Sequence, residues 1–329
     1  MKKIKFGIIG CSSIAERTVI PAILKAKNSE LSFVGSRTEE KAKKFAKKFS
    51  CKKYGSYKEV LENNDIDAVY ISLPIALQEK MVLDSAKAKK HILCEKSSTI
   101  SFRSAEKMIQ TCKKNNVQIL EGFSFIHHPQ QKKVSEYIKN NKIGDVFSFI
   151  GKYGFILPYS KNNFRFNKEL GGGVLNDVGC YLIKASRMIF ETNPISVNCN
   201  LYSEKKSDVD LKGSIYMKFP NNKIAVGLFS YLDNFQSNYE IWGQKGSISL
   251  ERAFNAKYNV STSIQTTIKD KIEKFKTKPT NQSEKMILYF CDVITNSKNK
   301  SNLNNELLNQ ALVMEKARLS NDMQKTILL

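Results

Sequence analysis

The sequence predicts an α/β protein of two domains: first a doubly wound parallel sheet, then an α+β domain with an open, mostly antiparallel sheet. In the first 124 residues, short and wholly apolar runs alternate with segments of helical period, as in parallel sheets whose strands are buried on both faces. After that point strand-like runs follow one another, and the helices are set apart from them. A chain of 329 residues has the length of about two domains, so we expect them to span residues 1–124 and 125–329.

The first domain is expected to alternate strands with helices. The apolar runs that predict strands are Ile4–Ile9, Leu31–Gly35, Ala68–Leu73, His91–Cys94 and Val117–Glu121. The segments of helical period are Ile14–Ala26, Glu39–Phe49, Tyr57–Glu62, Leu77–Lys89 and Ser104–Asn115. Parallel strands need a long crossover between them, and these helical segments would supply it.

The second domain is expected to combine a run of strands with four helices. The predicted strands are Val146–Phe155, Ile195–Tyr202, Gly213–Phe219, Ile224–Tyr231, Tyr239–Gly243 and Ser247–Leu250. The predicted helices are His128–Asn140, Val174–Phe190, Glu284–Thr295 and Leu303–Ser320. Turn-forming residues at Asn221-Asn222 and Gln244-Lys245-Gly246 separate neighbouring strands, which favours antiparallel pairing.

The chain is strongly basic, with 53 Lys and Arg against 31 Asp and Glu, a formal net charge of +22. Such a charge invites a nucleic-acid interpretation. The basic residues are spread along the chain, however, and there is no zinc finger, RNP motif or basic-aromatic stripe. We therefore expect no nucleic-acid partner. A positive field would instead favour a phosphorylated cofactor or substrate.

The cysteines and histidines indicate where in the cell the protein is located and whether it binds a metal. Seven scattered cysteines without a Cys-x-x-Cys pair favour reduced thiols and a cytoplasmic location. The three histidines show no metal-ligand spacing, so no metal site is expected. No run approaches about 18 apolar residues, which predicts no transmembrane helix. The first apolar run breaks at Cys11 and charge returns at Glu16, which argues against a secretory signal.

A turn rich in small residues, Gly10-Cys11-Ser12-Ser13-Ile14-Ala15, follows the first expected strand. The dinucleotide-binding pattern G-x-G-x-x-G/A needs small residues here, because backbone N–H groups must approach a pyrophosphate at a helix N-terminus. Gly10 occupies the tight-turn position, Ser12 stands where the second Gly belongs, and Ala15 allows close helix packing. The pattern alone is weak, but the strand before it and the helix after it strengthen the prediction.

The second expected strand is followed by Ser36 and Arg37. An NAD site would place Asp or Glu here for the ribose hydroxyls. Ser36 can bond to a 2′-phosphate, and Arg37 can bond to it and stack on adenine, so the pair favours NADP over NAD. The alternative is an ordinary surface arginine.

Further motifs follow in order along almost the whole chain: Ile71-Ser72-Leu73-Pro74, Cys94-Glu95-Lys96, Glu121-Gly122-Phe123, Ile143-Gly144-Asp145, Leu170-Gly171-Gly172-Gly173, Asp177-Val178-Gly179-Cys180-Tyr181 and Glu240-Ile241-Trp242-Gly243. As an ordered set they make the chain resemble the Gfo/Idh/MocA oxidoreductases, named for glucose–fructose oxidoreductase and inositol dehydrogenase. It is most similar to the branch containing NADP-linked sugar 3-ketoreductases, D-xylose dehydrogenase and dihydrodiol dehydrogenase. The resemblance implies a Rossmann first domain and hydride transfer between the nicotinamide C4 and a sugar carbonyl or hydroxyl.

The resemblance also implies roles for individual residues. Lys96 corresponds to the lysine that binds and polarises the reacting oxygen, and Tyr181 would give or take the hydroxyl proton. Asp177 and Tyr181 would share one helix face, although capping and packing are the alternative roles for them. Arg165 aligns with an arginine that reaches the cofactor in relatives. The expected cofactor-binding set is Gly10, Cys11, Ser12, Ser13, Ile14, Ser36, Arg37, Ser72, Leu73, Pro74, Leu77, Glu95, Lys96 and Arg165.

Several positions depart from the family pattern. Ser97 replaces the proline after the lysine, and in relatives that Lys–Pro bond is often cis, a conformation that is rare before other residues. Ile75, Gln78 and Ile126 replace the usual Asn, His and Arg, and Phe164 replaces a Trp. These changes remove polar groups near the nicotinamide and the substrate, which would mean an unusual substrate or weakened catalysis.

The sequence therefore predicts an NADP-dependent oxidoreductase that acts on a keto sugar or a nucleotide-linked sugar. The alternatives are a dehydrogenase of free sugars or dihydrodiols, and a non-catalytic, NADP-binding regulatory protein. The departures from the family pattern favour the regulatory protein, whereas the intact Lys96 and Tyr181 oppose it. Because the open sheet often forms a subunit interface in this family, the resemblance also implies a homodimer or homotetramer.

Overall fold

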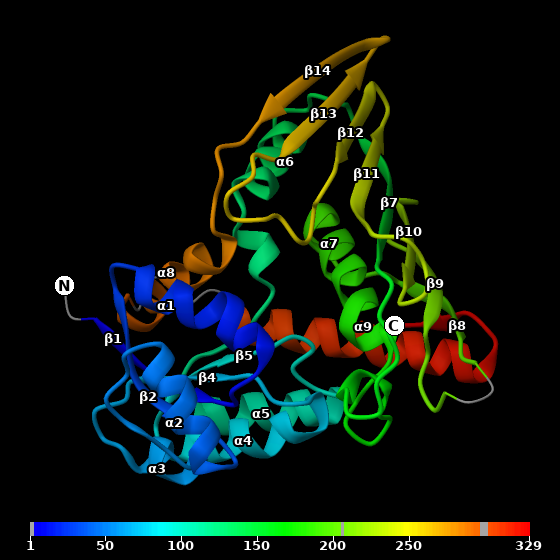
Figure 1. Cartoon of the computed structure of the whole chain (residues 1–329). Helices are drawn as coiled ribbons and strands as arrows, with labels where there is room; N and C mark the ends of the chain where they lie inside the picture. Colours follow the sequence, from blue (N-terminus) through cyan, green and yellow to red (C-terminus); the bar gives the residue numbers. More distant parts are fainter. Residues whose placement is uncertain (1–2, 205–206, 297–301) are drawn as a thin grey trace. The chain divides into compact units, whose positions relative to one another are not determined.

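The computed structural model describes residues 3–204, 207–296 and 302–329 (Figure 1). The chain forms two compact units that divide after Ser124. The first unit also takes in residues 283–308, which the sequence analysis placed in the second domain. The second unit comprises residues 125–282 and 309–329.

The first unit is built on a parallel sheet with the strand order β3-β2-β1-β4-β5-β6. Its strands are β1 (Ile4–Ile9), β2 (Ser29–Gly35), β3 (Tyr54–Gly55), β4 (Ala68–Ile71), β5 (His91–Cys94) and β6 (Ile119–Glu121). All four residues of β4 are buried, the pattern of a strand covered on both faces. The order reverses between β1 and β4, and ligands of such sheets bind at the carboxyl ends of the strands on either side of this switch point.

The helices of the first unit are α1 (Ile20–Lys25), α2 (Glu39–Lys48), α3 (Tyr57–Glu62), α4 (Ile75–Lys87), α5 (Phe102–Lys114) and α8 (Gln282–Thr295). Four of the five helices expected in the first domain lie within two residues of these bounds, whereas the expected helix Ile14–Ala26 begins six residues before α1. Local hydrogen bonds explain some helix starts: Ser56 and Glu59 form a capping box at α3, and the Ser101 hydroxyl accepts the Ser104 N–H at α5. A π-helical turn (Ala15–Val19) precedes α1.

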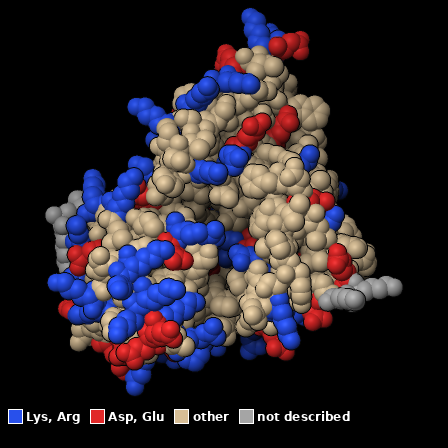
Figure 2. All heavy atoms as spheres, in the orientation of Figure 1, with Lys and Arg blue, Asp and Glu red and all other residues tan. Residues whose placement is uncertain are grey.

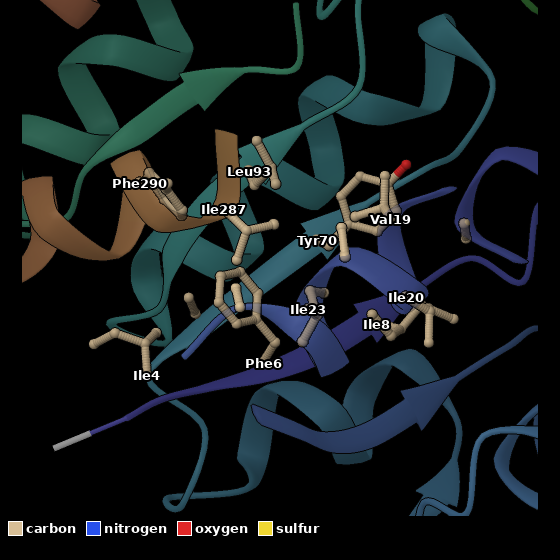
Figure 3. Close-up of a cluster of buried hydrophobic side chains, with 14 of the residues drawn as sticks. Ile4, Phe6, Ile8, Val19, Ile20, Ile23, Tyr70, Leu93, Ile287 and Phe290 are labelled. Carbon is tan, nitrogen blue, oxygen red and sulfur yellow. The ribbon is translucent and has the colours of Figure 1, made fainter. Parts of the chain in front are cut away.

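The apolar face of α8 completes the core of the first unit (Figure 3). Ile287 and Phe290 are completely buried, and the Phe290 ring centre lies 6.3 Å from that of Phe6 on β1. Burial of each such side chain stabilises the unit by about 1.5–3 kcal/mol. The helical period of this segment shows that it has an apolar face but not which core that face covers. The segment was therefore expected in the second domain, whereas residues 283–308 belong to the first unit.

The second unit is built on a mixed sheet with the order β14-β13-β12-β11-β7-β10-β9-β8-β15. Its strands are β7 (Val146–Gly154), β8 (Ser196–Tyr202), β9 (Lys212–Lys218), β10 (Ile224–Ser230), β11 (Gln236–Gly243), β12 (Gly246–Leu250), β13 (Ser263–Ile268), β14 (Lys271–Lys276) and β15 (Ile327–Leu328). β7 and β10 pair in parallel, and the other neighbours pair antiparallel. This confirms the mostly antiparallel sheet. Sequence analysis missed the last three strands: β14 has six exposed residues and β15 only two in all.

One face of this sheet is covered by helix α7 (Cys180–Phe190), while other residues of the sheet are exposed (Figure 1). A Cβ on Gly151 or Gly227 would lie within 3.0 Å of the Leu182 side chain, so these glycines on β7 and β10 let α7 pack closely. The other helices of this unit are α6 (Pro129–Lys139) and α9 (Leu303–Met323), of which α9 begins in the first unit.

Two surface properties bear on the function. Figure 2 shows Lys and Arg side chains spread over the visible face and interspersed with Asp and Glu, rather than gathered in one basic stripe. Among the described residues, no helix is both long enough and apolar enough to cross a membrane.

Candidate active site

The predicted phosphate-binding turn lies at the switch point of the first unit. Gly10 follows β1 with φ +105°, and a Cβ at this residue would lie 2.9 Å from the Ser72 carbonyl oxygen. The Ser72 hydroxyl, which follows β4, donates a hydrogen bond of 2.7 Å to the Gly10 carbonyl. The loops after β1 and β4 are therefore tied together, and only glycine fits at residue 10 without displacing the other loop.

The residues after Gly10 present small or exposed groups at the helix start. The Ser12 hydroxyl accepts the Ala15 N–H at 3.1 Å, while the Ser13 and Ile14 side chains are exposed. Cys11 points inward, and burial raises the pKa of its thiol despite a hydrogen bond to Ser36. Backbone N–H groups at a helix N-terminus can bind a pyrophosphate, whereas the buried thiol cannot. Cys11 is thus available to a cofactor through its backbone and not through its side chain.

The end of β2 carries the two residues that predict NADP. Ser36 is buried and its N–H donates to the Gly55 carbonyl at 3.0 Å, which fixes the backbone here. Arg37 is exposed. Burial raises the pKa of the neighbouring Tyr57, and the Arg37 charge opposes that rise. The pair thus offers a hydroxyl and a guanidinium to a phosphate, with no carboxylate at residues 36–38 to repel it.

The loop after β4 is braced by a side chain that the sequence analysis treated only as a departure from the family. Gln78 is buried, and its amide donates to the Leu73 carbonyl at 2.9 Å. The Cys94 thiol donates to the Gln78 carbonyl oxygen at 2.8 Å. Leu73 and Pro74 are partly buried, and Leu77 is 44% exposed, so the predicted binding surface of this loop remains accessible.

The loop that carries Lys96 is held on both sides by carboxylates. Glu95 accepts a 2.7 Å hydrogen bond from the hydroxyl of the completely buried Tyr70. Glu121 accepts from the N–H and the hydroxyl of Ser98 at 2.9 and 3.0 Å. The Lys96–Ser97 peptide bond is cis, as the Lys–Pro bond often is in relatives. No sequence pattern marks Tyr70 or Ser98, because their partners Glu95 and Glu121 are more than 20 residues away in the chain.

In the second unit, Asp177 lies in a π-helical turn (Leu175–Gly179) directly before α7. The Arg165 Nε donates to its Oδ2 at 2.6 Å, and the Tyr231 hydroxyl donates to the same oxygen at 3.0 Å. The Asp177 side chain is 12% exposed and that of Arg165 33% exposed. Burial lowers the pKa of Arg165, but the negative charge of Asp177 outweighs it and the net shift is upward. Arg165 therefore stays a cation.

The predicted proton donor Tyr181 lies one helical turn after Asp177. Its ring contacts three aromatic rings, those of Tyr153, Phe125 and Phe254, with centroid distances of 5.0, 5.6 and 5.8 Å. A charge on Tyr181 would also raise the pKa of Arg165, so the two side chains are within electrostatic range of each other. The structure thus brings together the three residues that the sequence predicts in this unit. It adds Tyr231, which the sequence analysis recorded only as the end of a strand.

The two adjacent histidines are buried, and His128 has a structural role at the start of α6. Burial lowers the pKa of both His127 and His128 to about 4, so both are neutral at physiological pH. The His128 Nδ1 accepts the Gln130 N–H at 3.2 Å and caps α6. Among the described residues, no group of three or more His, Cys, Asp or Glu is arranged to hold a metal ion.

Two family models match the chain. A model described as an oxidoreductase family with an NAD-binding Rossmann fold, GFO_IDH_MocA, matches residues 4–123. A model of the GFO/IDH/MocA C-terminal domain matches residues 131–249. These matches confirm the fold class and the resemblance on which the residue roles were predicted.

Relatives and solved structures agree with the family models. A dTDP-3,4-didehydro-2,6-dideoxy-alpha-D-glucose 3-reductase from Saccharopolyspora spinosa is 32% identical over 77% of this chain and 76% of its own length. The enzyme of the same name from Actinomadura kijaniata is 28% identical over 96% of this chain and 95% of its own. A crystal structure of a 3-ketoreductase from Actinomadura kijaniata with NADP and TDP-benzene has a TM-score of 0.92 and 27% identity, and covers 97% of this chain and 98% of its own.

Proposed function

Since the chain belongs to the GFO/IDH/MocA family of NAD(P)-dependent oxidoreductases, we propose that it uses NADPH to reduce the keto group of a nucleotide-linked sugar. The observation that carries this proposal is the likeness over 97% of the chain to a 3-ketoreductase solved with NADP and TDP-benzene. Two relatives named as reductases of a dTDP-linked keto sugar support the same substrate class. The net charge of +22 suits an anionic diphosphate substrate.

The residues at the switch point fit NADP. Gly10 lets the loops after β1 and β4 lie in contact, and N–H groups at the helix start that follows can bind a pyrophosphate. Ser36 and Arg37 would bind the 2′-phosphate, because a hydroxyl and a guanidinium both donate hydrogen bonds to it. The loop of Ser72, Leu73, Pro74 and Leu77, together with Glu95, Lys96 and Arg165, completes the proposed cofactor-binding set.

The proposed reaction assigns one task to each unit. When bound, NADPH supplies the hydride that reduces the carbonyl carbon. The Lys96 ammonium stabilises the negative charge that develops on the carbonyl oxygen. The Tyr181 hydroxyl donates its proton to that oxygen and regains one from solvent, so the product is an alcohol. Asp177 orients the region around Tyr181 and keeps Arg165 in place through their 2.6 Å hydrogen bond.

The open face of the second sheet supports the proposal of a homodimer or homotetramer. Ile150 on β7, Leu228 on β10 and Trp242 on β11 are exposed by 45%, 48% and 59%. Exposed apolar side chains on neighbouring strands form the kind of surface that a second copy covers. Sedimentation velocity on Trp242→Glu and on the unaltered protein tests this: a shift to monomer is expected, and an unchanged oligomer would contradict the proposed interface.

A cytoplasmic location is proposed on the basis of the cysteines. All seven are free thiols, and six of them are buried. Thiols that persist unpaired are typical of a reducing compartment. Fractionation of the native cells with an antibody against the protein tests this location, and a protein recovered outside the cytoplasm would contradict it.

The first experiment is a paired titration with NADPH and NADH, followed by turnover with a dTDP-linked 3-keto sugar or with D-xylose and NADP. We expect NADPH to bind at least about 10-fold more tightly than NADH, since only NADPH carries the phosphate that Arg37 would bind. We expect consumption of NADPH with the dTDP-linked ketone. Turnover of D-xylose alone would favour a dehydrogenase of free sugars. NADPH binding without turnover would favour the regulatory protein.

A further inference from the structure

Tyr231, the residue directly after β10, is completely buried. Together with Arg165 it donates a hydrogen bond to Asp177. Its N–H donates to the Leu211 carbonyl and its own carbonyl accepts the Leu157 N–H, both at 2.8 Å. Its ring packs against Phe155 and Phe166, with centroid distances of 5.8 and 6.1 Å. Backbone and ring are thus held from several sides, and the hydroxyl has a defined position.

The Tyr231 hydroxyl donates its hydrogen bond to acceptors and does not accept one from them. It lies 3.0 Å from the Asp177 Oδ2 and 3.4 Å from the Gly173 carbonyl oxygen, both of them acceptors. Burial, and after it the negative charge of Asp177, raises the pKa of Tyr231 well above its usual value. The phenol therefore keeps its proton at every pH at which an enzyme of this kind works.

The same carboxylate oxygen also accepts from Arg165, at 2.6 Å. The backbone reinforces this arrangement, because the Gly173 N–H donates to the Arg165 carbonyl at 2.9 Å and the Asp177 N–H donates to the Gly173 carbonyl at 3.2 Å. Two donors from distant segments converge on one oxygen, so the rotation of the carboxylate is fixed. Without Tyr231, this oxygen would lose one of the two donors that converge on it.

We propose that Tyr231 is a positioning residue, which holds the Asp177 carboxylate and through it the Arg165 guanidinium in the orientation that Tyr181 needs for proton transfer. This inference rests on the proposed function, and it adds a residue that touches neither substrate nor cofactor. It explains why a hydroxyl is placed in an otherwise apolar, aromatic surrounding, where it needs a partner to offset the cost of its burial.

A double-mutant cycle tests this role, with Tyr231→Phe, Asp177→Asn and the double variant. In the unaltered background, Tyr231→Phe is expected to lower kcat by about 10- to 100-fold, the size of effect expected for one hydrogen bond to a charged group, with KM within about threefold. In the Asp177→Asn background the same change is expected to lower kcat by less than about threefold. A residue that acted independently of Asp177 would give the same factor in both.

The pH dependence of kcat is a second measurement, because a mere loss of packing around Tyr231 would not shift it. The charged and titratable groups near the Asp177 carboxyl include Arg165, Tyr181 and Tyr231, and Asp210 lies near Tyr231. A carboxylate that loses a donor takes up a proton more readily. The acid limb of the kcat profile is therefore expected to move to higher pH in Tyr231→Phe.

Tyr239→Phe is the matched control. Tyr239 on β11 is equally buried in the same unit, but its hydroxyl donates to the Gln131 Oε1 at 2.6 Å and not to Asp177. We expect it to lower the melting temperature while kcat stays within about threefold and the pH profile does not move. Equal kinetic effects of Tyr239→Phe and Tyr231→Phe would overturn the proposal.

Thermal unfolding of the four proteins of the double-mutant cycle tests this inference independently of the proposed function. These are the unaltered protein, the two single variants and the double variant. Tyr231→Phe is expected to lower the melting temperature less in the Asp177→Asn background than in the unaltered one. An unaltered protein that reduces no keto sugar would overturn the proposed function, and the unfolding cycle would still show whether Tyr231 acts on Asp177. Additive shifts in melting temperature together with additive losses in kcat would overturn the inference alone.

Discussion

The two units prepare their site residues in different ways. In the first unit, a glycine with φ +105° lets the loops after two parallel strands lie against each other. In the second unit, side chains from three segments form a charged cluster on one carboxylate oxygen of Asp177. The first arrangement depends on the absence of a side chain, and the second depends on the presence of particular ones. The first unit should therefore tolerate side-chain changes around Gly10 that the second unit would not tolerate around Asp177.

The largest expected effect tests whether both units supply chemistry. Lys96→Ala in the first unit and Tyr181→Phe in the second should each lower kcat at least about 100-fold without loss of NADPH binding, because each removes a group proposed to act on the reacting oxygen. Steady-state kinetics and an NADPH titration measure the two quantities. Lys87→Ala, at an exposed position on α4, is the control. Rates like those of the unaltered protein in both variants would contradict the proposed site.

Gly10→Ala tests the role of backbone in the first unit. A Cβ at this residue would meet the Ser72 carbonyl at 2.9 Å and would require a positive φ that alanine rarely adopts. NADPH binding should weaken by about 10- to 100-fold, measured by fluorescence titration. Ser13→Ala, in the same turn, keeps the backbone N–H proposed to approach the cofactor and should change the affinity less than about threefold. Similar affinities for the two variants would mean that the turn does not approach the cofactor.

Arg37→Asp asks whether a single side chain sets the cofactor preference in the unit that otherwise relies on backbone. NADPH affinity should fall by about 10-fold or more, because a carboxylate would replace the guanidinium beside the 2′-phosphate. NADH serves as the internal control, since it lacks that phosphate. An equal loss of affinity for both cofactors would point to a disrupted fold instead. A high salt concentration should weaken NADPH binding to the unaltered protein and have less effect in the variant.

The last prediction concerns the stability of the second unit in acid and no change in activity or cofactor binding. The pKa of His128 is about 4 in the folded protein and near 6.5 when exposed, so the unfolded chain binds more protons between these values. The free energy of unfolding should therefore fall as the pH is lowered from about 6.5 to about 4, by up to about 3 kcal/mol from this residue. His128→Asn preserves a side chain able to cap α6 and should reduce this pH dependence of the melting temperature, while the buried His127 keeps its own contribution. An unchanged pH dependence would show that other groups control acid stability.

Much of the first unit could be predicted because its signals are local. The apolar runs gave β1 and β5 with their observed bounds, and the small residues after β1 marked the turn. The two-residue β3 has no such signal. Helix α8 was recognised as a helix, but its partner could not be recognised, because Phe290 finds Phe6 only after the chain has folded.

In the second unit the sequence predicted which residues matter but not what holds them. The family resemblance indicates Asp177 and Tyr181 through one motif and Arg165 through another. Nothing in the pattern around Tyr231 distinguishes it from any aromatic residue at a strand end. Its hydroxyl reaches Asp177 across 54 positions of sequence. Gln78 is a similar case. The sequence shows that Gln replaces the usual His of the family, but it does not show the hydrogen bond from Gln78 to the Leu73 carbonyl.

The sequence by itself determined the alternation of strands and helices, the small residues of the turn after β1 and the side chains available for chemistry, because periodicity and steric demand act over neighbouring residues. Tertiary structure alone decided the strand order, the core that α8 joins and the two donors on Asp177. The physical reason is the same in each case. Burial and hydrogen bonding are satisfied by whichever groups the fold brings together, and those groups are distant in the chain.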